Sequence, residues 1–313
     1  MTNHNRSEWN LDFINVGYGD SIFISTGQGE MHALLVDCGD IPSRIESERG
    51  MRTTALAFLQ RKGVNALDLI WLTHLHLDHV GGLEELVNSL PAAELITAYL
   101  PPEALIGAQA PVPRGASDGV VCLLTALNIY SRSLKVLKQA GTKLIVITPE
   151  SKHAPLRWPG LTLTPYHAPN PLGFRFMQNC FDQALQGDPD VNALARLDLV
   201  INDLSVGLRA VGAKKAAELP GDLGLESCKT LLTGGCGVFK MPHHGHRFSV
   251  DEELMERLHP ELTVISVSDN RPDGCPHSES IRLAEAHSGK VCFTDSVMWN
   301  GRREARKSVP FSL

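Results

Sequence analysis

The sequence predicts an α/β protein in which two sheets are covered by helices. Three observations support this class: the chain begins with a run of strands, continues with strands and helices in alternation, and returns to a run of strands between residues 199 and 241. Its 313 residues, of which 43% are hydrophobic and 20% charged, suffice for one large domain with a substantial core. We predict that this domain spans residues 11–299, between an N-terminal tail at 1–10 and a basic C-terminal tail at 300–313.

Strands are expected where short β-type apolar runs are bounded by glycine or proline turns. Gly17-Tyr18-Gly19-Asp20 and Gly27-Gln28-Gly29 separate the first three strands, and Pro101-Pro102 ends the fifth. The predicted strands are 11–16, 21–25, 33–37, 67–73, 95–100, 143–148, 161–166, 199–211, 230–233, 238–241, 262–267 and 290–294.

Helices are expected where apolar residues recur at helical spacing. The longest is amphipathic and covers residues 120–140, ending before Gly141. Residues 171–197 are expected to form a loop and a helix that cover another part of the molecule. The other predicted helices are 53–60, 83–87, 252–258 and 279–287.

The segment Leu72-Thr-His-Leu-His-Leu-Asp-His-Val-Gly-Gly82 is the most informative part of the chain, because four possible metal ligands lie within six residues. If the extended geometry of the preceding strand continues, His74, His76 and Asp78 point to one side, into a cleft, and the leucines between them point into the core. His79 breaks the alternation. Packing would require a separate buried partner for each of these side chains. The segment therefore predicts a site for zinc, manganese or iron.

Three other expected strands end in residues with related chemistry. Asp37 either caps a turn or orients a ligating histidine from outside the ligand set. His243, His244 and His246 follow another buried strand, which favours a further ligand among them. For His167, at a third strand end, packing and ligation both remain open.

Charge and cysteine content limit the compartment and the partners. A formal net charge of −6 argues against broad electrostatic binding to nucleic acid, with the basic run 302–307 as a local exception. Seven cysteines without a CxxC pair indicate reduced thiols and a cytoplasmic setting. No signal peptide and no apolar run near the ~18 residues of a membrane span is evident, so no membrane partner is expected.

These motifs resemble those of the metallo-β-lactamase superfamily and, within it, the hydrolase domain of ComEC-like competence and DNA-internalisation proteins. The resemblance implies a four-layer αββα sandwich with a metal site along one edge of the sheets. Besides the histidine segment and the Asp37 strand end, it rests on Asn15-Val16-Gly17-Tyr18-Gly19-Asp20-Ser21, Asn202-Asp203-Leu204-Ser205-Val206, Lys240-Met241-Pro242-His243-His244-Gly245, Val264-Ile265-Ser266-Val267-Ser268, Gly274-Cys275-Pro276-His277 and Phe293-Thr294-Asp295.

The resemblance also implies roles for individual residues. Two zinc ions are expected, with manganese as an alternative. The implied positions are His74 and His76 on one metal, Asp78 and His79 on the second, His167 at the third motif, His243 or His244 completing the second site, and Asp37 as supporting acid.

Two departures from the family pattern bear on the second metal. The family usually places an aspartate that bridges the metals directly after Leu-Thr-Gly, where this chain has Thr233-Gly234-Gly235-Cys236. Cys236 could replace it as a thiolate ligand, which would favour zinc, and Asp222 is a weaker candidate. Cys275 also stands where relatives often have histidine. If neither replacement works, the second metal is weakly held or the site has lost activity.

The predicted function is that of a metal-dependent hydrolase, most specifically a phosphodiesterase or nuclease using a metal-activated hydroxide. Asp78 would steer the nucleophile, and His246 or His277 would protonate the leaving group. The expected partner is nucleic acid or another phosphodiester. The alternatives are a hydrolase of small esters, lactones or thioesters, for which residues 171–197 could be a lid, and a catalytically impaired regulatory module.

Overall fold

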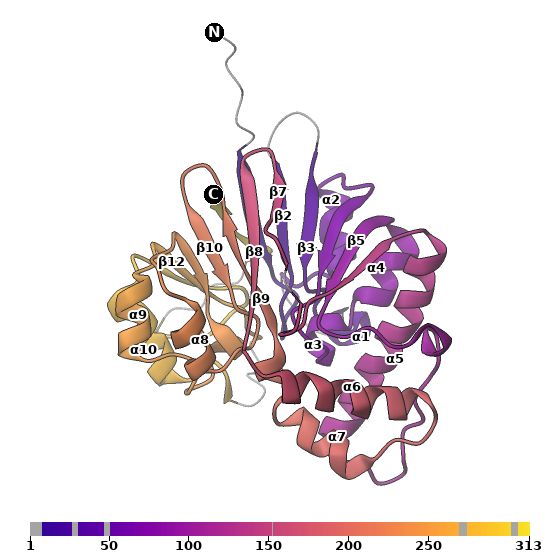
Figure 1. Ribbon diagram of the computed structural model, residues 1–313. Coiled ribbons are helices and arrows are strands. Elements are labelled where there is room, and N and C mark those ends of the chain that lie inside the picture. The colour runs from indigo at the N-terminus through magenta and orange to yellow at the C-terminus, as the bar shows by residue number, and fades with distance from the viewer. Residues whose placement is uncertain (1–7, 27–30, 47–50, 152, 269–273, 302–305) are drawn as a thin grey trace.

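The chain folds into two seven-stranded sheets packed against each other, with helices on both outer faces (Figure 1). The computed structural model describes residues 8–26, 31–46, 51–151, 153–268, 274–301 and 306–313. The principal hydrophobic core contains side chains from both sheets, such as Phe13 and Leu208. The predicted four-layer αββα sandwich is thus confirmed.

The first sheet combines an antiparallel and a parallel half. Its strands in spatial order are β14 (Ser308–Ser312), β1 (Trp9–Ile14), β2 (Ile22–Thr26), β3 (Ala33–Val36), β4 (Leu67–Trp71), β5 (Ala92–Thr97) and β6 (Lys143–Val146). Pairing is antiparallel from β14 to β3 and parallel from β3 to β6.

The second sheet has the same mixed character. Its order is β13 (Val291–Phe293), β12 (Leu262–Ile265), β11 (Val238–Lys240), β10 (Ala216–Leu219), β9 (Val206–Val211), β8 (Leu161–His167) and β7 (Leu156–Trp158). The strands from β10 to β13 are parallel, and those from β7 to β10 are antiparallel.

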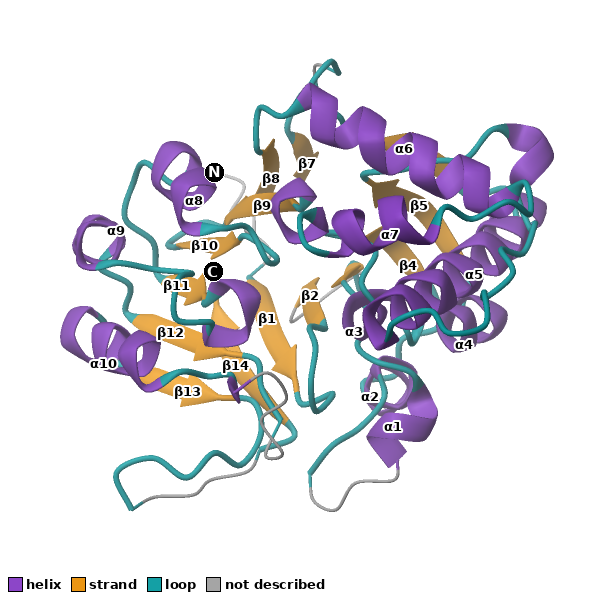
Figure 2. Ribbon diagram, turned by 90° about the horizontal axis from the view of Figure 1, so that it is seen from below, coloured by secondary structure: helices purple, strands orange, loops and turns teal. Residues whose placement is uncertain are grey.

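The helices form the outer layers and one end of the sandwich. Helices α2 (Ala55–Arg61), α4 (Leu83–Ser89) and α5 (Asp118–Gln139) cover the first sheet, and α8 (Leu225–Leu231), α9 (Glu252–Leu258) and α10 (Ser278–His287) cover the second (Figure 1). Helices α6 (Pro171–Leu185) and α7 (Val191–Asp198) lie at the end of the sandwich that faces the viewer in Figure 2. The short helices are α1 (Pro42–Glu46), α3 (Leu77–Val80), η1 (Glu103–Leu105), η2 (Ile201–Leu204) and η3 (Pro242–Gly245).

Helix α5 is long and apolar enough to cross a membrane by length and composition alone. In the structure, however, 61% of its most apolar window is buried inside the protein. It contacts α4 and α7. This is the environment of a core helix.

Several predicted elements differ from the structure. The strand predicted at 230–233 is wrong, because the end of α8 occupies this segment and turns Cys228 toward the second core cluster. Residues 199–205 contain η2 instead of the start of a strand, and β10, whose sequence Ala-Ala-Glu-Leu has little β-type character, was not predicted.

The predicted C-terminal tail at 300–313 also needs correction. Residues Ser308–Ser312 form β14, which pairs along its whole length with β1 and buries Val309. Most of the basic run, residues 302–305, lies outside the described residues.

The topology gathers the chemically informative strand ends at one edge. Strands β3 and β4 are parallel, as are β10, β11 and β12, so the carboxyl ends within each set lie at the same edge of their sheet. The backbone N–H of Val206 donates to the carbonyl of Thr73, and Trp71 Nε1–H donates to the carbonyl of Val206, at 2.8 Å in both cases. These bonds join the end of β4 to the start of β9, and the edges of the two sheets meet there.

Candidate metal centre

The centre is built around Asp37, which directly follows β3. Its Oδ1 accepts the backbone N–H of Thr73 at 2.8 Å, and its Oδ2 accepts the Thr73 hydroxyl at 2.7 Å. The same Oδ2 lies 2.8 Å from Nδ1 of His79. Since a carboxylate accepts, Nδ1 of His79 carries the proton and Nε2 is left to face the cluster. Asp37 thus occupies the supporting position expected for it.

His74 and His76 point toward each other, as the alternation after β4 predicts. The distance from His74 Nε2 to His76 Nδ1 is 3.2 Å. Two nitrogens at Zn–N bonds of ~2.0–2.1 Å in a tetrahedral site are separated by about 3.3 Å. The pair therefore has the spacing of two ligands on one cation.

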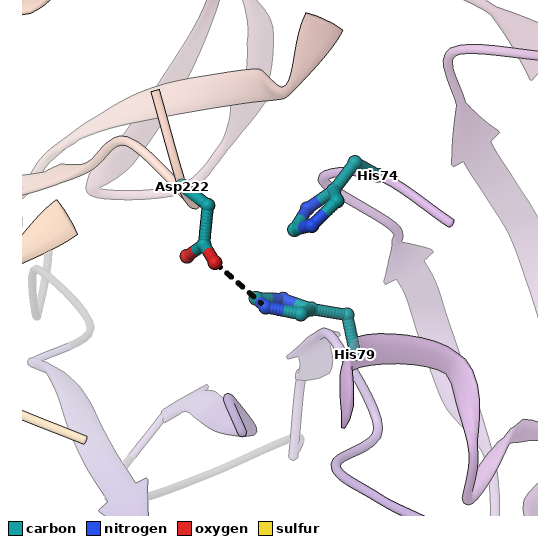
Figure 3. A group of neighbouring side chains, drawn as sticks. All are labelled: His74, His79 and Asp222. Atoms are coloured by element: carbon teal, nitrogen blue, oxygen red, sulfur yellow. Dashed lines mark ion pairs between the residues drawn. The ribbon is translucent and has the colours of Figure 1, made fainter. Parts of the chain in front are cut away.

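Asp222, in the turn after β10, completes the cluster from the second sheet (Figure 3). Its Oδ2 is 3.4 Å from Nε2 of His79 and 3.4 Å from Nε2 of His244. Donor atoms of His74, His79 and Asp222 lie within 4.8 Å of one another, and so do those of Asp78, His79 and His244. Asp222 faces both donor sets, which is the position expected of a bridging acid.

Cys236 is not the replacement for that acid. It lies between α8 and β11, and its backbone N–H donates to the carbonyl of Leu258. The charged groups that affect it are Glu218 and Arg209, and burial raises the pKa of its thiol to about 12. It belongs to no group of ligand atoms among the described residues. The prediction of a Cys236 thiolate ligand is therefore corrected in favour of Asp222.

Lys240 binds the oxygen of Asp222 that does not face the histidines. Its ammonium is fully buried, lies 3.2 Å from Asp222 Oδ1, and forms a second ion pair with Asp20. These two carboxylates raise the pKa of Lys240 although burial opposes this. Asp222 Oδ1 is thereby occupied, and Oδ2 is turned toward the histidines.

Gly19 allows Asp20 to reach this position. Its φ is +113°, and a Cβ there would lie 2.0 Å from the backbone carbonyl oxygen of Asp78. That carbonyl also accepts the backbone N–H of Asp20 at 3.2 Å. Only glycine fits such a close approach of two backbones, so the Gly-Tyr-Gly-Asp turn packs directly on the histidine segment.

The structure also decides between His243 and His244. Nδ1–H of His244 donates to the carbonyl of Ser266 at 3.1 Å, and its Nε2 lies 3.0 Å from Asp78 Oδ2. His243 turns away, with its Nε2 3.2 Å from Nδ2 of Asn202. Both histidines have left-handed backbones, with φ of 52° and 46°, and such strain is typical of functional sites. His244 is the ligand candidate.

The other predicted residues lie outside the donor cluster. His167 directs Nδ1 to the carbonyl of Ala168 and its ring to Phe174. His246 stacks on His243 with ring centroids 5.0 Å apart, and His277 lies edge-on to His246 at 5.1 Å. Among these, only His243 lines the central cavity of about 710 Å³, which makes His246 and His277 poor proton donors for a leaving group there. Cys275 lies beside His277.

The donor set fits a divalent cation. Nε2 of His79 is buried, and no group of the described residues hydrogen-bonds it, although two carboxylates lie at 3.4 and 3.7 Å. Imidazole nitrogens and carboxylate oxygens at this spacing are typical of zinc and related metals.

The sequence alone ranked Asp222 below Cys236 as a ligand and did not indicate that Lys240 or Asp20 supports the centre. The signal for Asp222 was Pro220-Gly221-Asp222 at the end of an apolar run.

Metal binding should strengthen as the pH rises toward 9. Burial lowers the pKa of His244, but Asp222 and Asp78 outweigh burial and raise it to about 9. A metal requires the neutral imidazole, so below pH 9 a cation must displace this proton. We expect the zinc affinity of the metal-free protein to rise about tenfold per pH unit from 6 toward 9 for each displaced proton. Chelator competition measures this, and an affinity independent of pH would contradict it.

Comparison with known proteins agrees with this fold. A model of the metallo-beta-lactamase superfamily matches residues 14–173. ComE operon protein 3 of Bacillus subtilis (strain 168) is 23% identical over 300 residues, covering 92% of this chain and 32% of that protein. The chain therefore spans about a third of the length of this curated relative. The crystal structure of the metallo-beta-lactamase fold protein YhfI from Bacillus subtilis is similar with a TM-score of 0.50 at 11% identity, covering 98% of this chain and 99% of that chain, and it supports the fold alone.

Proposed function

This chain belongs to the metallo-beta-lactamase superfamily, and from that premise we propose that it is a zinc-dependent phosphodiesterase that acts on nucleic acid. The superfamily consists generally of metal-dependent hydrolases, so the proposal concerns the metal and the substrate. The seven cysteines form no disulfide, which supports a reducing compartment, and we propose the cytoplasm.

The observation that carries the proposal is the pair of donor groups at the cavity, His74 with His79 and Asp222, and Asp78 with His79 and His244, because Asp222 Oδ2 lies 3.4 Å from a histidine of each. His74, His76 and Asp222 would hold one cation, and Asp78, His79, His244 and Asp222 the other. Two bound cations would lower the pKa of a water molecule and neutralise the charge that develops on a phosphate in an in-line displacement. A bridging carboxylate between two such sets suits phosphodiester hydrolysis.

The residues of the chain position the substrate and the nucleophile. Asp78 Oδ2 lies 3.0 Å from Nε2 of His244 and 3.7 Å from Nε2 of His79, at the centre of the cluster. Burial raises the pKa of Asp78, but His79 and His244 outweigh burial and hold it well below the usual range. Asp78 is therefore ionised and can orient a water molecule. Asn202 fixes the ring of His243 at the cavity wall, where the ring would face a bound diester.

A row of aromatic rings supports a nucleic-acid substrate. His243 lines the cavity, His246 stacks on it at 5.0 Å, and Phe248 follows with ring centroids 5.6 Å from His246. Phe248 is 71% exposed, and the guanidinium of Arg247 lies 6.0 Å from its ring centroid. Exposed rings next to arginine are typical stacking platforms for the bases of single strands.

One observation favours a second candidate, a hydrolase of small esters. Asp198 and Leu199, at the end of α7, line the cavity together with His76. These two residues directly follow residues 171–197, the segment suspected of being a lid. A cavity of about 710 Å³ is also within the range of small-molecule pockets, roughly 300–1,000 Å³. The impaired-module alternative loses its main support, since an aspartate does face both donor sets.

Substrate profiling tests the proposal. Zinc-loaded protein should hydrolyse bis(p-nitrophenyl) phosphate and single-stranded oligonucleotides, and a chelator should stop both reactions. The double variant H76A/D78A, which lacks a donor from each set, should be inactive while keeping its fold. Turnover of lactones or thioesters without any phosphodiester would favour the small-ester hydrolase. No turnover of any substrate would favour the impaired module.

Replacing Phe248 by Ala should separate a nuclease from a general phosphodiesterase. Loss of one base-stacking ring weakens binding by about 1–3 kcal/mol. We therefore expect kcat/KM for single-stranded oligonucleotides to fall roughly 5- to 150-fold. Hydrolysis of bis(p-nitrophenyl) phosphate, which has no nucleobase to stack on Phe248, should not change. The equally exposed apolar residue Leu172 provides the control variant L172A, expected to act as the wild type. Equal oligonucleotide turnover by F248A and wild type would exclude the stacking platform.

A further inference from the structure

We propose that Asp198 is a positioning residue that fixes the ring orientation and tautomer of His76, and that it thereby couples metal binding to the docking of helices α6 and α7. The inference rests on the proposed function only in requiring that His74 and His76 hold a cation. Asp198 lies beyond residues 14–173, the part of the chain matched by the family model, and no motif in the sequence indicated it.

The two ring nitrogens of His76 face different partners. Nδ1 points to His74 Nε2 at 3.2 Å, and Nε2 points to Asp198 Oδ1 at 3.4 Å. A neutral imidazole carries one proton, so ligation through Nδ1 requires that the proton reside on Nε2. A carboxylate facing Nε2 stabilises that tautomer and holds the ring plane.

No competing partner for Nε2 exists among the described residues. The atom is buried and none of the described groups hydrogen-bonds it, so the Asp198 carboxylate at 3.4 Å is the polar group that faces it. The opposite tautomer would place the proton on Nδ1, toward His74, where it blocks ligation through that atom, and would turn the Nε2 lone pair toward the Asp198 carboxylate. Asp198 is thus the group that selects the ligating form of His76.

The carboxylate of Asp198 interacts unfavourably with the dipole of its own helix and favourably with the dipole of a neighbouring helix. It is the last residue of α7, where a carboxylate opposes the helix dipole. Its side chain extends to the first turn of α5, which lies beside α7 (Figure 1), and there the dipole attracts an anion. A Cβ on Gly119 would lie only 2.2 Å from Asp198 Oδ2. Glycine at 119 therefore makes room for the carboxylate.

The same segment contacts the other side of the centre. Asn202, in η2 just after α7, lies 3.2 Å from Nε2 of His243. Helix α7 is itself defined by an N-cap, in which Asp190 accepts the backbone N–H groups of Asn192 and Ala193. One helical segment thus contacts a histidine from each of the two histidine motifs, and its docking orders both.

Zinc affinity measured by chelator competition tests the proposal without relying on activity. D198A should bind zinc about 10- to 100-fold more weakly than wild type, since loss of such a supporting group typically has this effect. D198E should restore part of the affinity. D188N removes the same charge from an exposed position of the same segment and should bind as the wild type does.

G119A provides an independent variant that leaves Asp198 in place. Alanine is favourable in a helix, so the fold should persist while the added Cβ displaces the carboxylate, and zinc affinity should fall as in D198A. If D198A fails to fold, the zinc affinity of G119A tests the role of Asp198 instead. Affinities within twofold of wild type in the folded variants would overturn the role of Asp198. A wild-type protein that binds no zinc would instead overturn the proposed function.

Discussion

Replacing Asp222 by Ala should lower phosphodiester turnover about 10³-fold or more and reduce the zinc content from two ions per chain to one or fewer. Asp222 Oδ2 is 3.4 Å from the Nε2 atoms of both His79 and His244, and no other described carboxylate faces His74 and His79 together. Without it, neither donor set is complete, and two cations would repel each other without a shared anion. Elemental analysis and initial rates measure the two effects.

The matched control is C236A. If the thiol at Cys236 were the bridging ligand, this variant would lose metal and activity, and D222A would keep them. The structure predicts the reverse, because burial keeps the Cys236 thiol protonated, with a pKa of about 12, in a different part of the fold. Two zinc ions in D222A would contradict the assignment of Asp222.

Replacing Lys240 by Met should destabilise the metal-free protein by about 3–5 kcal/mol, the usual effect of breaking a buried ion pair. The Lys240 ammonium is buried, pairs with Asp20 and Asp222, and donates to the Gly221 carbonyl at 3.1 Å. Methionine matches the length of the side chain but leaves two buried carboxylates without their cation. Urea unfolding at neutral pH measures the difference.

K214M is the control for this loss of charge. Lys214 also pairs with an acid, Glu8 at 3.2 Å, but its side chain is 73% exposed, and solvent screens such a pair. K214M should unfold at the urea concentration of the wild type. If K240M were equally stable, Lys240 would not support the centre, and the orientation of Asp222 would need another cause.

Local patterns predicted most of the fold. The long helix α5, the strand β4 and the helix α9 were placed within a few residues, because each has a clear apolar period and a defined end. The errors have non-local causes. The β-type residues near Thr230 form the end of a helix because the second core cluster buries one helical face there, and β14 forms because β1 offers it an edge.

In the candidate centre, too, local sequence patterns predict some residues, and non-local contacts decide the others. Residues 74–79 are recognisable from their spacing, since the segment that follows β4 and the short helix α3 deliver all four donors. The choices of Asp222 over Cys236 and of His244 over His243 are not local. Both depend on the parallel pairing of β10 and β11, which brings the ends of these strands to the edge beside β4.

The sequence by itself predicted two sheets covered by helices and a metal site at the histidine segment, from periodicity and from ligand spacing within a short stretch, and the resemblance of its motifs indicated the superfamily and the four-layer sandwich. Only the tertiary structure placed Asp222 beside His79 and His244, Lys240 beside Asp222, and Asp198 from α7 beside His76. The local sequence at the end of a strand sets which donor side chains lie there. Which strand ends meet is fixed by sheet pairing, by helix docking and by contacts between the sheets, such as that of Trp71 with Val206, 135 positions apart.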